Sequence, residues 1–176
     1  MRVDTIRVRK IQDMTLVNGV GIRMIIYFPG CPHNCDGCHN PKLQDYAYGI
    51  DRDIDELIEY IKIRKQWIDG ITLSGGDPLF QLNSMKEFLI RLRQDPELKD
   101  LDVWLYTGYL FEQIPGKIKM LVNVIIDGKY DKTKPIARWR GSDNQRLFQK
   151  VIGKSYKQIR TFDDIDKFRE EYKNET

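Results

Sequence analysis

Three cysteines that stand close together are the residues of this chain with the clearest chemical meaning. Cys31, Cys35 and Cys38 have the spacing C-x3-C-x2-C, and they are the only cysteines among the 176 residues. An odd set of thiols in one short segment does not build a disulfide framework, so we interpret the segment as a metal site. Three thiolates can hold three irons of a [4Fe-4S] cluster, which usually takes four cysteines, and the fourth iron is then open to an external ligand.

The segment around the cysteines, residues 29–41, has the composition of a tight loop, with two glycines and three prolines. Such a loop can direct several backbone N–H groups at an anionic cluster. The alternative is a zinc site made by the three thiols together with His33 or His39, the only histidines in the chain. Each histidine could equally be a loop residue bonded to nearby backbone. A structural zinc site usually takes a second ligand pair from a distant segment, which this sequence lacks, and this favours the cluster.

The elements that must position this loop follow from the apolar pattern. Short apolar runs alternate with segments whose apolar residues recur at helical spacing, such as Ile54, Leu57, Ile58 and Ile61. The pattern predicts strands at residues 24–28, 71–73, 103–106 and 121–126, a weaker strand at 147–152, and helices at 51–68, 84–93, 110–120 and 163–172.

Strands separated by helices indicate parallel strands joined by right-handed crossovers. A complete eight-unit barrel needs about 250 residues, more than this chain has. We therefore expect one α/β domain, residues 1–176, built as an open sheet or an incomplete parallel β/α barrel with about five or six strands. In both arrangements the chemistry gathers at the carboxyl ends of the strands.

The residues that follow the predicted strands have the types that bind small ligands. Gly75 and Gly76 would let a ligand approach the main chain closely. Asp77 and Pro78 also form a good helix start, with the aspartate as the cap. The further strand ends carry Thr107-Gly108 and Asp127-Gly128-Lys129. Asp127 and Lys129 could bind ribose hydroxyls and a carboxylate, or they could be ordinary turn residues.

Composition limits the class of protein. Hydrophobic residues make up 41% of the chain and charged residues 31%, which is typical of a soluble globular protein. The formal charge of +3 is too small and too dispersed to indicate nucleic-acid binding. The sequence contains no run of about 18 apolar residues, so we expect no membrane span. The first ten residues lack the apolar block of a signal peptide, so we expect a cytoplasmic protein.

Six stretches in a fixed order resemble a known family, the radical S-adenosylmethionine enzymes, whose hallmark is the C-x3-C-x2-C loop. Within it the chain is similar to the activating proteins of anaerobic ribonucleoside-triphosphate reductases. The resemblance implies the incomplete barrel, and the chain after about residue 150 matches poorly. The stretches are VNGVGIR at 17–23, the cysteine loop, LSGGDPL at 73–79, WLYTGY at 104–109, NVIIDGK at 123–129, and WRGS with NQ at 139–145.

The resemblance also implies roles for individual residues. Cys31, Cys35 and Cys38 would ligate a [4Fe-4S] cluster, and the amino and carboxylate groups of S-adenosylmethionine would chelate the remaining iron. Gly75 and Gly76 would contact the methionine amino group. The full set of predicted cofactor-binding residues is Gly37, Cys38, His39, Gly75, Gly76, Asp77, Thr107, Asp127 and Lys129.

The implied function is the activation of a partner enzyme. The cluster would reductively cleave S-adenosylmethionine, and the 5′-deoxyadenosyl radical would take a hydrogen from a glycine Cα in the large subunit of the reductase. The electron would come from a low-potential donor such as flavodoxin. His39-Asn40 is also seen in activators of pyruvate formate-lyase, which is the alternative, whereas residues 139–145 favour the reductase. Two other hypotheses are that the protein is a radical enzyme for a small molecule, such as a deazapurine-forming synthase, or a non-catalytic binding module stabilised by zinc.

Overall fold

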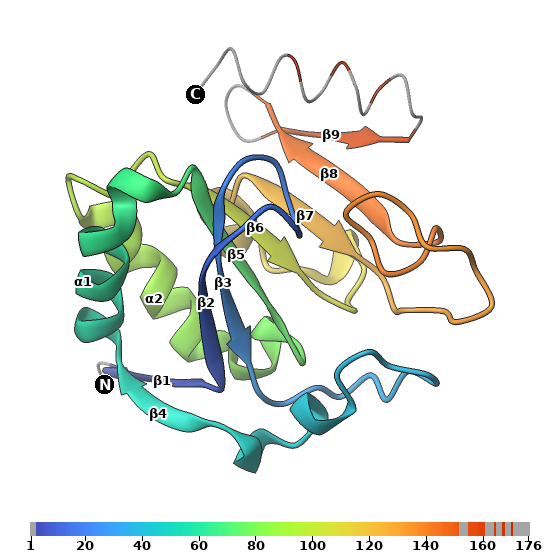
Figure 1. Ribbon diagram of the computed structural model, residues 1–176, viewed down its shortest axis with the longest axis horizontal. Helices are drawn as coiled ribbons and strands as arrows, with labels where there is room; N and C mark the ends of the chain where they lie inside the picture. Colours follow the sequence, from blue (N-terminus) through green and yellow to red (C-terminus); the bar gives the residue numbers. More distant parts are fainter. Residues whose placement is uncertain (1–2, 152–154, 161–163, 165–166, 168–169, 171–176) are drawn as a thin grey trace.

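A seven-stranded mixed sheet forms the centre of the protein (Figure 1). The computed structural model describes residues 3–151, 155–160, 164, 167 and 170. Four neighbouring strands in the middle of the sheet run parallel, while one strand at the first edge and two at the second run antiparallel to their neighbours. From edge to edge the order is β2 (Lys10–Thr15), β3 (Arg23–Phe28), β5 (Gly70–Gly75), β6 (Asp102–Tyr106), β7 (Val124–Asp127), β8 (Arg146–Lys150) and β9 (Tyr156–Ile159).

The prediction of an incomplete parallel β/α barrel is wrong, because the sheet is mixed and three of its six strand pairings are antiparallel. The physical reason lies in the connections. Parallel neighbours need a crossover, usually a helix, whereas a short or helix-free connection can return the chain antiparallel. β2 leads to β3, and β8 to β9, through short segments. The loop from β7 to β8, residues 128–145, contains no helix.

Helices α1, α2 and α3 pack on one face of this sheet. Alternate strand residues such as Met24, Ile26 and Leu105 share a buried cluster with helical residues such as Ile61 and Phe88. α1 begins at a well-formed cap, because the Asp53 side chain accepts hydrogen bonds from the first backbone N–H groups of the helix. The bounds are α1 (Ile54–Arg64), α2 (Leu82–Gln94) and α3 (Gly116–Leu121).

A second, two-stranded antiparallel sheet and several single turns complete the described part of the chain. The pair joins the start of the chain to the segment that follows the cysteine loop. These elements are β1 (Thr5–Val8), β4 (Ile50–Asp53), and the 3-10 turns η1 (Pro41–Gln44), η2 (Tyr46–Tyr48), η3 (Lys65–Trp67), η4 (Pro78–Gln81) and η5 (Phe111–Gln113).

The opposite face of the sheet carries a buried arginine that holds the segment between β2 and β3. Arg23 donates hydrogen bonds to the Val20 carbonyl at 3.0 Å and to the Asp102 carboxylate at 2.7 Å. Its Nε also donates to Thr72 Oγ1, which in turn donates to the Asn18 carbonyl at 2.8 Å. These bonds fold residues 16–22 back toward the sheet and bring Asn18 to the rim where the cysteines lie.

Most predicted elements are present with shifted bounds. The strands predicted at 24–28, 71–73 and 103–106 correspond to β3, β5 and β6. The predicted helix 110–120 is divided into η5 and α3, and β7 begins only after α3 ends. β1, β2, β4 and β9 were not predicted. Residue 152 of the weaker predicted strand and the helix predicted at 163–172, apart from three isolated positions, lie outside the described residues.

None of the helices formed by the described residues is both long enough and apolar enough to span a bilayer.

Candidate metal centre

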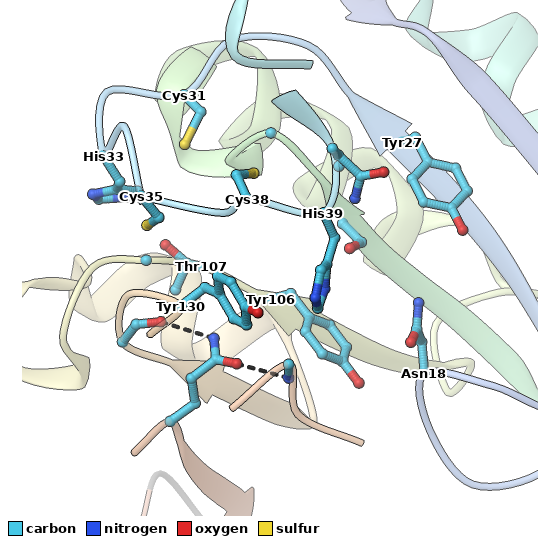
Figure 2. Close-up of a pocket in the computed structure, with 18 residues that line it drawn as sticks. Asn18, Tyr27, Cys31, His33, Cys35, Cys38, His39, Tyr106, Thr107 and Tyr130 are labelled. Carbon is cyan, nitrogen blue, oxygen red and sulfur yellow. Dashed lines mark hydrogen bonds between the residues drawn. The ribbon is translucent and has the colours of Figure 1, made fainter. Parts of the chain in front are cut away.

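A pocket of about 290 Å³ lies at the carboxyl ends of the four parallel strands (Figure 2). This volume is at the lower end of the range for small-ligand sites. Its wall combines the cysteine loop, the ends of β5 and β6, and the loop between β7 and β8. The lining residues are Asn18, Tyr27, Cys31, His33, Cys35, Cys38, His39, Asn40, Ser74, Gly75, Gly76, Tyr106, Thr107, Gly108, Gly128, Tyr130, Gly141 and Gln145.

The three cysteines are half-buried and line this one pocket. Figure 2 shows their side chains on a single loop, arranged around a common space. Backbone hydrogen bonds fix the start of the loop, since Gly30 N–H donates to the Leu43 carbonyl at 2.8 Å and Cys31 N–H to the Gln44 carbonyl at 3.2 Å. A positive φ of 91° at Gly30 turns the chain sharply out of β3, a conformation that glycine adopts without strain.

The donor set fits an iron–sulfur cluster. In a cluster held by three cysteines, each thiolate binds a different iron, and three thiols of one loop on one pocket meet that need. Burial raises the pKa of the Cys31 thiol to about 11, partly offset by a hydrogen bond from the His33 backbone. Metal binding must therefore displace a proton from Cys31. Among the described residues, no group of three or more His, Cys, Asp or Glu side chains is placed so that it could hold a single metal ion.

Neither histidine is directed at the thiols as a zinc ligand would be. His33 Nε2 lies 2.6 Å from Asp77 Oδ2, and the ring meets the edge of Tyr109. The His39 ring packs on Tyr130 with a centroid separation of 4.4 Å. The sequence allowed that His33 bonds nearby backbone. Instead it bonds a carboxylate that is 44 residues away in the chain.

Asp77 is the buried centre to which three parts of the site are tied. Its carboxylate accepts hydrogen bonds from Thr107 Oγ1 at 2.9 and 3.1 Å and from the Gly108 N–H at 2.9 Å. It also accepts from the Leu79 N–H, which confirms the prediction that Asp77 caps a helix start. With His33 as the remaining partner, Asp77 joins the cysteine loop to the ends of β5 and β6. It was predicted to bind cofactor, and the structure places it behind the pocket wall instead of among the lining residues.

The glycine pair allows the end of β5 to approach the cysteine loop. A Cβ at Gly76 would lie 2.5 Å from the Gly30 carbonyl oxygen, and one at Gly75 would lie 2.5 Å from the backbone of Phe28. Gly75 also has a φ of 118°, which other residues rarely adopt. Both glycines line the pocket, as the prediction that they contact cofactor requires, and both are also needed for this close packing.

Gln145 holds the part of the pocket wall that is formed by the loop between β7 and β8. Its Oε1 accepts hydrogen bonds from the Gly141 and Ser142 N–H groups, and its Nε2 donates to the Gly128 carbonyl at 2.8 Å. The Tyr106 hydroxyl donates to the Trp139 carbonyl at 2.6 Å. These bonds fasten the loop between β7 and β8 to the ends of β6 and β7.

Asp127 and Lys129 lie beside the cysteine pocket and not in it. Asp127 is fully buried, where it accepts hydrogen bonds from the Arg146 guanidinium and from the Phe111 N–H. With Lys129 it lines a neighbouring cavity of about 490 Å³. Gly37, exposed in the cysteine loop, is likewise outside the lining set. The predicted residues that do line the pocket are Cys31, Cys35, Cys38, His39, Gly75, Gly76 and Thr107.

Several lining residues were not predicted as site residues. Tyr27 and Tyr106 project from β3 and β6 near their carboxyl ends, on the face opposite the helices. Strand alternation from the buried Ile26 and Leu105 indicates that face. Asn18 and Gln145 belong to stretches that were noted for the resemblance, VNGVGIR and NQ, but the sequence gives neither a specific partner.

Comparison with known proteins agrees with this geometry. The chain matches the family described as "4Fe-4S single cluster domain" over residues 17–148, a range that includes every residue lining the pocket. The protein named "Anaerobic ribonucleoside-triphosphate reductase-activating protein" in Enterobacteria phage T4 is 39% identical over 150 residues, covering 82% of this chain and 94% of the relative. A protein of the same name from Haemophilus influenzae is 34% identical over 140 residues, covering 74% and 89%. That of Escherichia coli (strain K12) is 33% identical over 141 residues, covering 74% and 90%.

Proposed function

Because this chain belongs to the family of anaerobic ribonucleoside-triphosphate reductase-activating proteins, we propose that it activates a partner reductase by radical chemistry at an iron–sulfur cluster. The partner is the large subunit of the reductase, and the residue activated on it is a glycine. The radical step and its cofactor go beyond the name of the family. They follow from the resemblance of the cysteine loop and the later stretches to radical S-adenosylmethionine enzymes, and the geometry of the cysteine pocket supports them.

The chemistry comes from the bound groups. A reduced [4Fe-4S] cluster would supply one electron that cleaves S-adenosylmethionine to methionine and a 5′-deoxyadenosyl radical, which takes a hydrogen atom from a glycine Cα and leaves 5′-deoxyadenosine and a glycyl radical. The protein provides the binding, the orientation and the protection of the reacting groups.

The residues of this chain divide these tasks. Cys31, Cys35 and Cys38 would hold three irons, so that one iron is left for the amino and carboxylate groups of S-adenosylmethionine. Gly75 and Gly76 present main chain without side chains to the same pocket, where an amino-acid group can approach closely. Asp77 acts as a positioning residue, because its hydrogen bonds align the cysteine loop with these strand ends.

One observation carries the proposal above the others. The three thiols, from the loop after β3, and the backbone of the glycine pair, at the end of β5, line the same pocket. The combination provides for a cluster and for an organic molecule beside it.

The test uses protein reconstituted with iron and sulfide without oxygen, mixed with dithionite, S-adenosylmethionine and the reductase large subunit. We expect 5′-deoxyadenosine and methionine in equal amounts, together with the electron paramagnetic resonance doublet of a glycyl radical on the large subunit. Cys35→Ala should abolish both products. Asp36→Ala is the matched control, since Asp36 is an exposed residue of the same loop whose partner is the surface residue Lys132. Full activity in Cys35→Ala, or no product from cluster-loaded wild type, would overturn the proposal.

A further inference from the structure

A groove lined by basic and aromatic side chains runs along the outer side of the cysteine loop. It has a volume of about 490 Å³ and lies at the sheet edge formed by β2. Arg9, Lys10 and Lys42 supply its positive charge, and Tyr27 and Tyr48 are its aromatic lining residues. The proposed activation chemistry does not use this groove.

The groove is in direct structural contact with the loop that carries the cysteines. Tyr27, His39 and Asn40 line both the groove and the cysteine pocket, so these residues separate the two spaces. Lys42 belongs to the turn η1, and the carbonyl of the residue after it, Leu43, accepts the hydrogen bond from Gly30 N–H. His39 directly follows the last cysteine. A molecule seated in the groove would therefore lie against the back of the cysteine loop.

The three cations of the groove are exposed and have no carboxylate partner in the described part of the chain. Nearby basic residues differ in this respect, since Arg7 pairs with Asp51 and Lys132 with Asp36. Arg9 lies over the Tyr48 ring, with its guanidinium carbon 4.0 Å from the ring centroid, and it donates a hydrogen bond to the Tyr48 hydroxyl. This contact orders the guanidinium but does not neutralise it.

We propose that this groove is the docking site for an acidic one-electron donor protein that reduces the cluster. This deepens the proposed function and rests on it. In the step, one electron passes from the reduced cofactor of the donor to the oxidised cluster, so the donor is oxidised by one electron and the cluster is reduced by one. No atom or proton is exchanged between the two proteins.

The position of the groove favours an electron donor over the reductase. The glycine of the reductase must reach the organic cofactor inside the pocket, whereas a protein in the groove has the shared residues Tyr27, His39 and Asn40 between it and the pocket. An electron needs no such opening and only has to cross the cysteine loop. The unpaired cations then attract a negatively charged face and hold it where that crossing is short.

The test compares two triple charge reversals. The groove variant is R9E/K10E/K42E. The control is K65E/K99E/K117E, which changes the net charge equally, at exposed lysines that lie outside the groove and form no ion pair within the described part of the chain. Lys65 follows α1, Lys99 follows α2 and Lys117 is in α3. The probe is reduced flavodoxin, and two quantities are measured at low and high ionic strength: its affinity for cluster-loaded protein and the rate constant of cluster reduction.

We expect the groove variant to lose about tenfold or more in both quantities at low salt, since electrostatic steering contributes on that scale. Wild type should fall toward the variant as salt is raised, and the control should stay close to wild type. Equal losses in both variants, or no loss in the groove variant, would overturn the proposal. If the triple variant does not assemble a cluster, the neutral variant K10Q/K42Q replaces it, with K65Q/K99Q as its control.

Dithionite separates this proposal from the proposed function. It reduces the cluster without docking, so the groove variant should still cleave S-adenosylmethionine when dithionite is the reductant. Loss of cleavage in wild type with dithionite would contradict the proposed function. Loss in the groove variant alone, under those conditions, would show that the groove serves the reductase or the cofactor and not the donor.

Discussion

His33 Nε2 in the cysteine loop lies 2.6 Å from the buried Asp77 Oδ2 at the end of β5. The same carboxylate binds Thr107 and Gly108 at the end of β6. One side chain therefore sets the position of the cysteines relative to the strand ends that share their pocket. In the proposed function the cysteines supply the ligands, and the hydrogen bonds of Asp77 hold their loop against these strand ends.

The first prediction concerns Asp77. Asp77→Ala leaves several buried donors without an acceptor, and each buried unsatisfied group costs about 1–3 kcal/mol. We expect metal-free Asp77→Ala to be less stable by at least this amount in denaturant unfolding. Asp36→Ala in the same loop should change the unfolding free energy by about 0.5 kcal/mol or less, because Asp36 is on the surface. An Asp77→Ala protein as stable as wild type would show that its hydrogen bonds contribute little.

A second prediction compares a glycine that has no space for a side chain with one whose Cβ position is open. Gly76→Ala places a methyl group against the Gly30 carbonyl, so it should push the cysteine loop away from β5 and reduce the iron bound per chain after reconstitution. Gly116→Ala is the control, since nothing lies within 4 Å of its Cβ position at the start of α3. The control should keep its iron and gain up to about 1 kcal/mol of stability. Normal iron content in Gly76→Ala would refute the close-packing argument.

The Gln145 contacts lead to a third prediction. Gln145→Ala frees the loop between β7 and β8 from the Gly128 carbonyl and from the Gly141 and Ser142 N–H groups. We expect the affinity for S-adenosylmethionine, measured by calorimetry on cluster-loaded protein, to fall about tenfold, which corresponds to roughly one net hydrogen bond.

Asn144→Ala is the comparison for Gln145→Ala. The Asn144 side chain makes a hydrogen bond to the Lys129 carbonyl at an exposed site and does not line the pocket. Its substitution should leave the affinity nearly unchanged. Equal affinities for wild type, Asn144→Ala and Gln145→Ala would mean that this wall takes no part in binding.

A fourth prediction follows from the Cys31 thiol. Burial raises its pKa from 9.0 to about 11 in the folded, metal-free protein. Between these values the unfolded chain loses the Cys31 proton while the folded protein retains it. The stability that the protonated, buried Cys31 thiol contributes is therefore fully present below pH 9 and is lost as the pH rises toward 11. The difference in unfolding free energy between wild type and Cys31→Ala should be constant below this range and shrink within it. A difference that grows with pH would contradict the assigned direction.

The sequence predicted the middle of the fold better than its edges. β3, β5 and β6 are apolar because both of their faces are buried, and such runs are easy to detect. β2, with the sequence KIQDMT, is a half-exposed edge strand whose polar residues hide its strand character. The antiparallel return into β8 depends on the helix-free loop at residues 128–145, whose path has no local signal.

In the candidate site, too, features that lie close together in the sequence could be predicted, and contacts between distant segments could not. Cysteine spacing and the glycine pair could be identified locally, and the resemblance to reductase activators, drawn from six stretches that include both, is confirmed by the relatives. The helix-cap role of Asp77 was predicted, but its link between the cysteine loop and β6 could not be, since its partners His33 and Thr107 are 44 and 30 residues away in the chain. Asp127 followed the expected pattern of a strand-end ligand, yet the structure pairs it with Arg146.

The open iron site is the central claim, and electron paramagnetic resonance tests it most directly. Anaerobically reconstituted wild type is reduced with dithionite, and its spectrum is recorded with and without S-adenosylmethionine. We predict the signal of a reduced four-iron cluster that changes shape when S-adenosylmethionine is added, because that molecule binds the iron without a cysteine. A cluster signal that S-adenosylmethionine leaves unaltered, or a protein that binds zinc and assembles no cluster, would contradict the account.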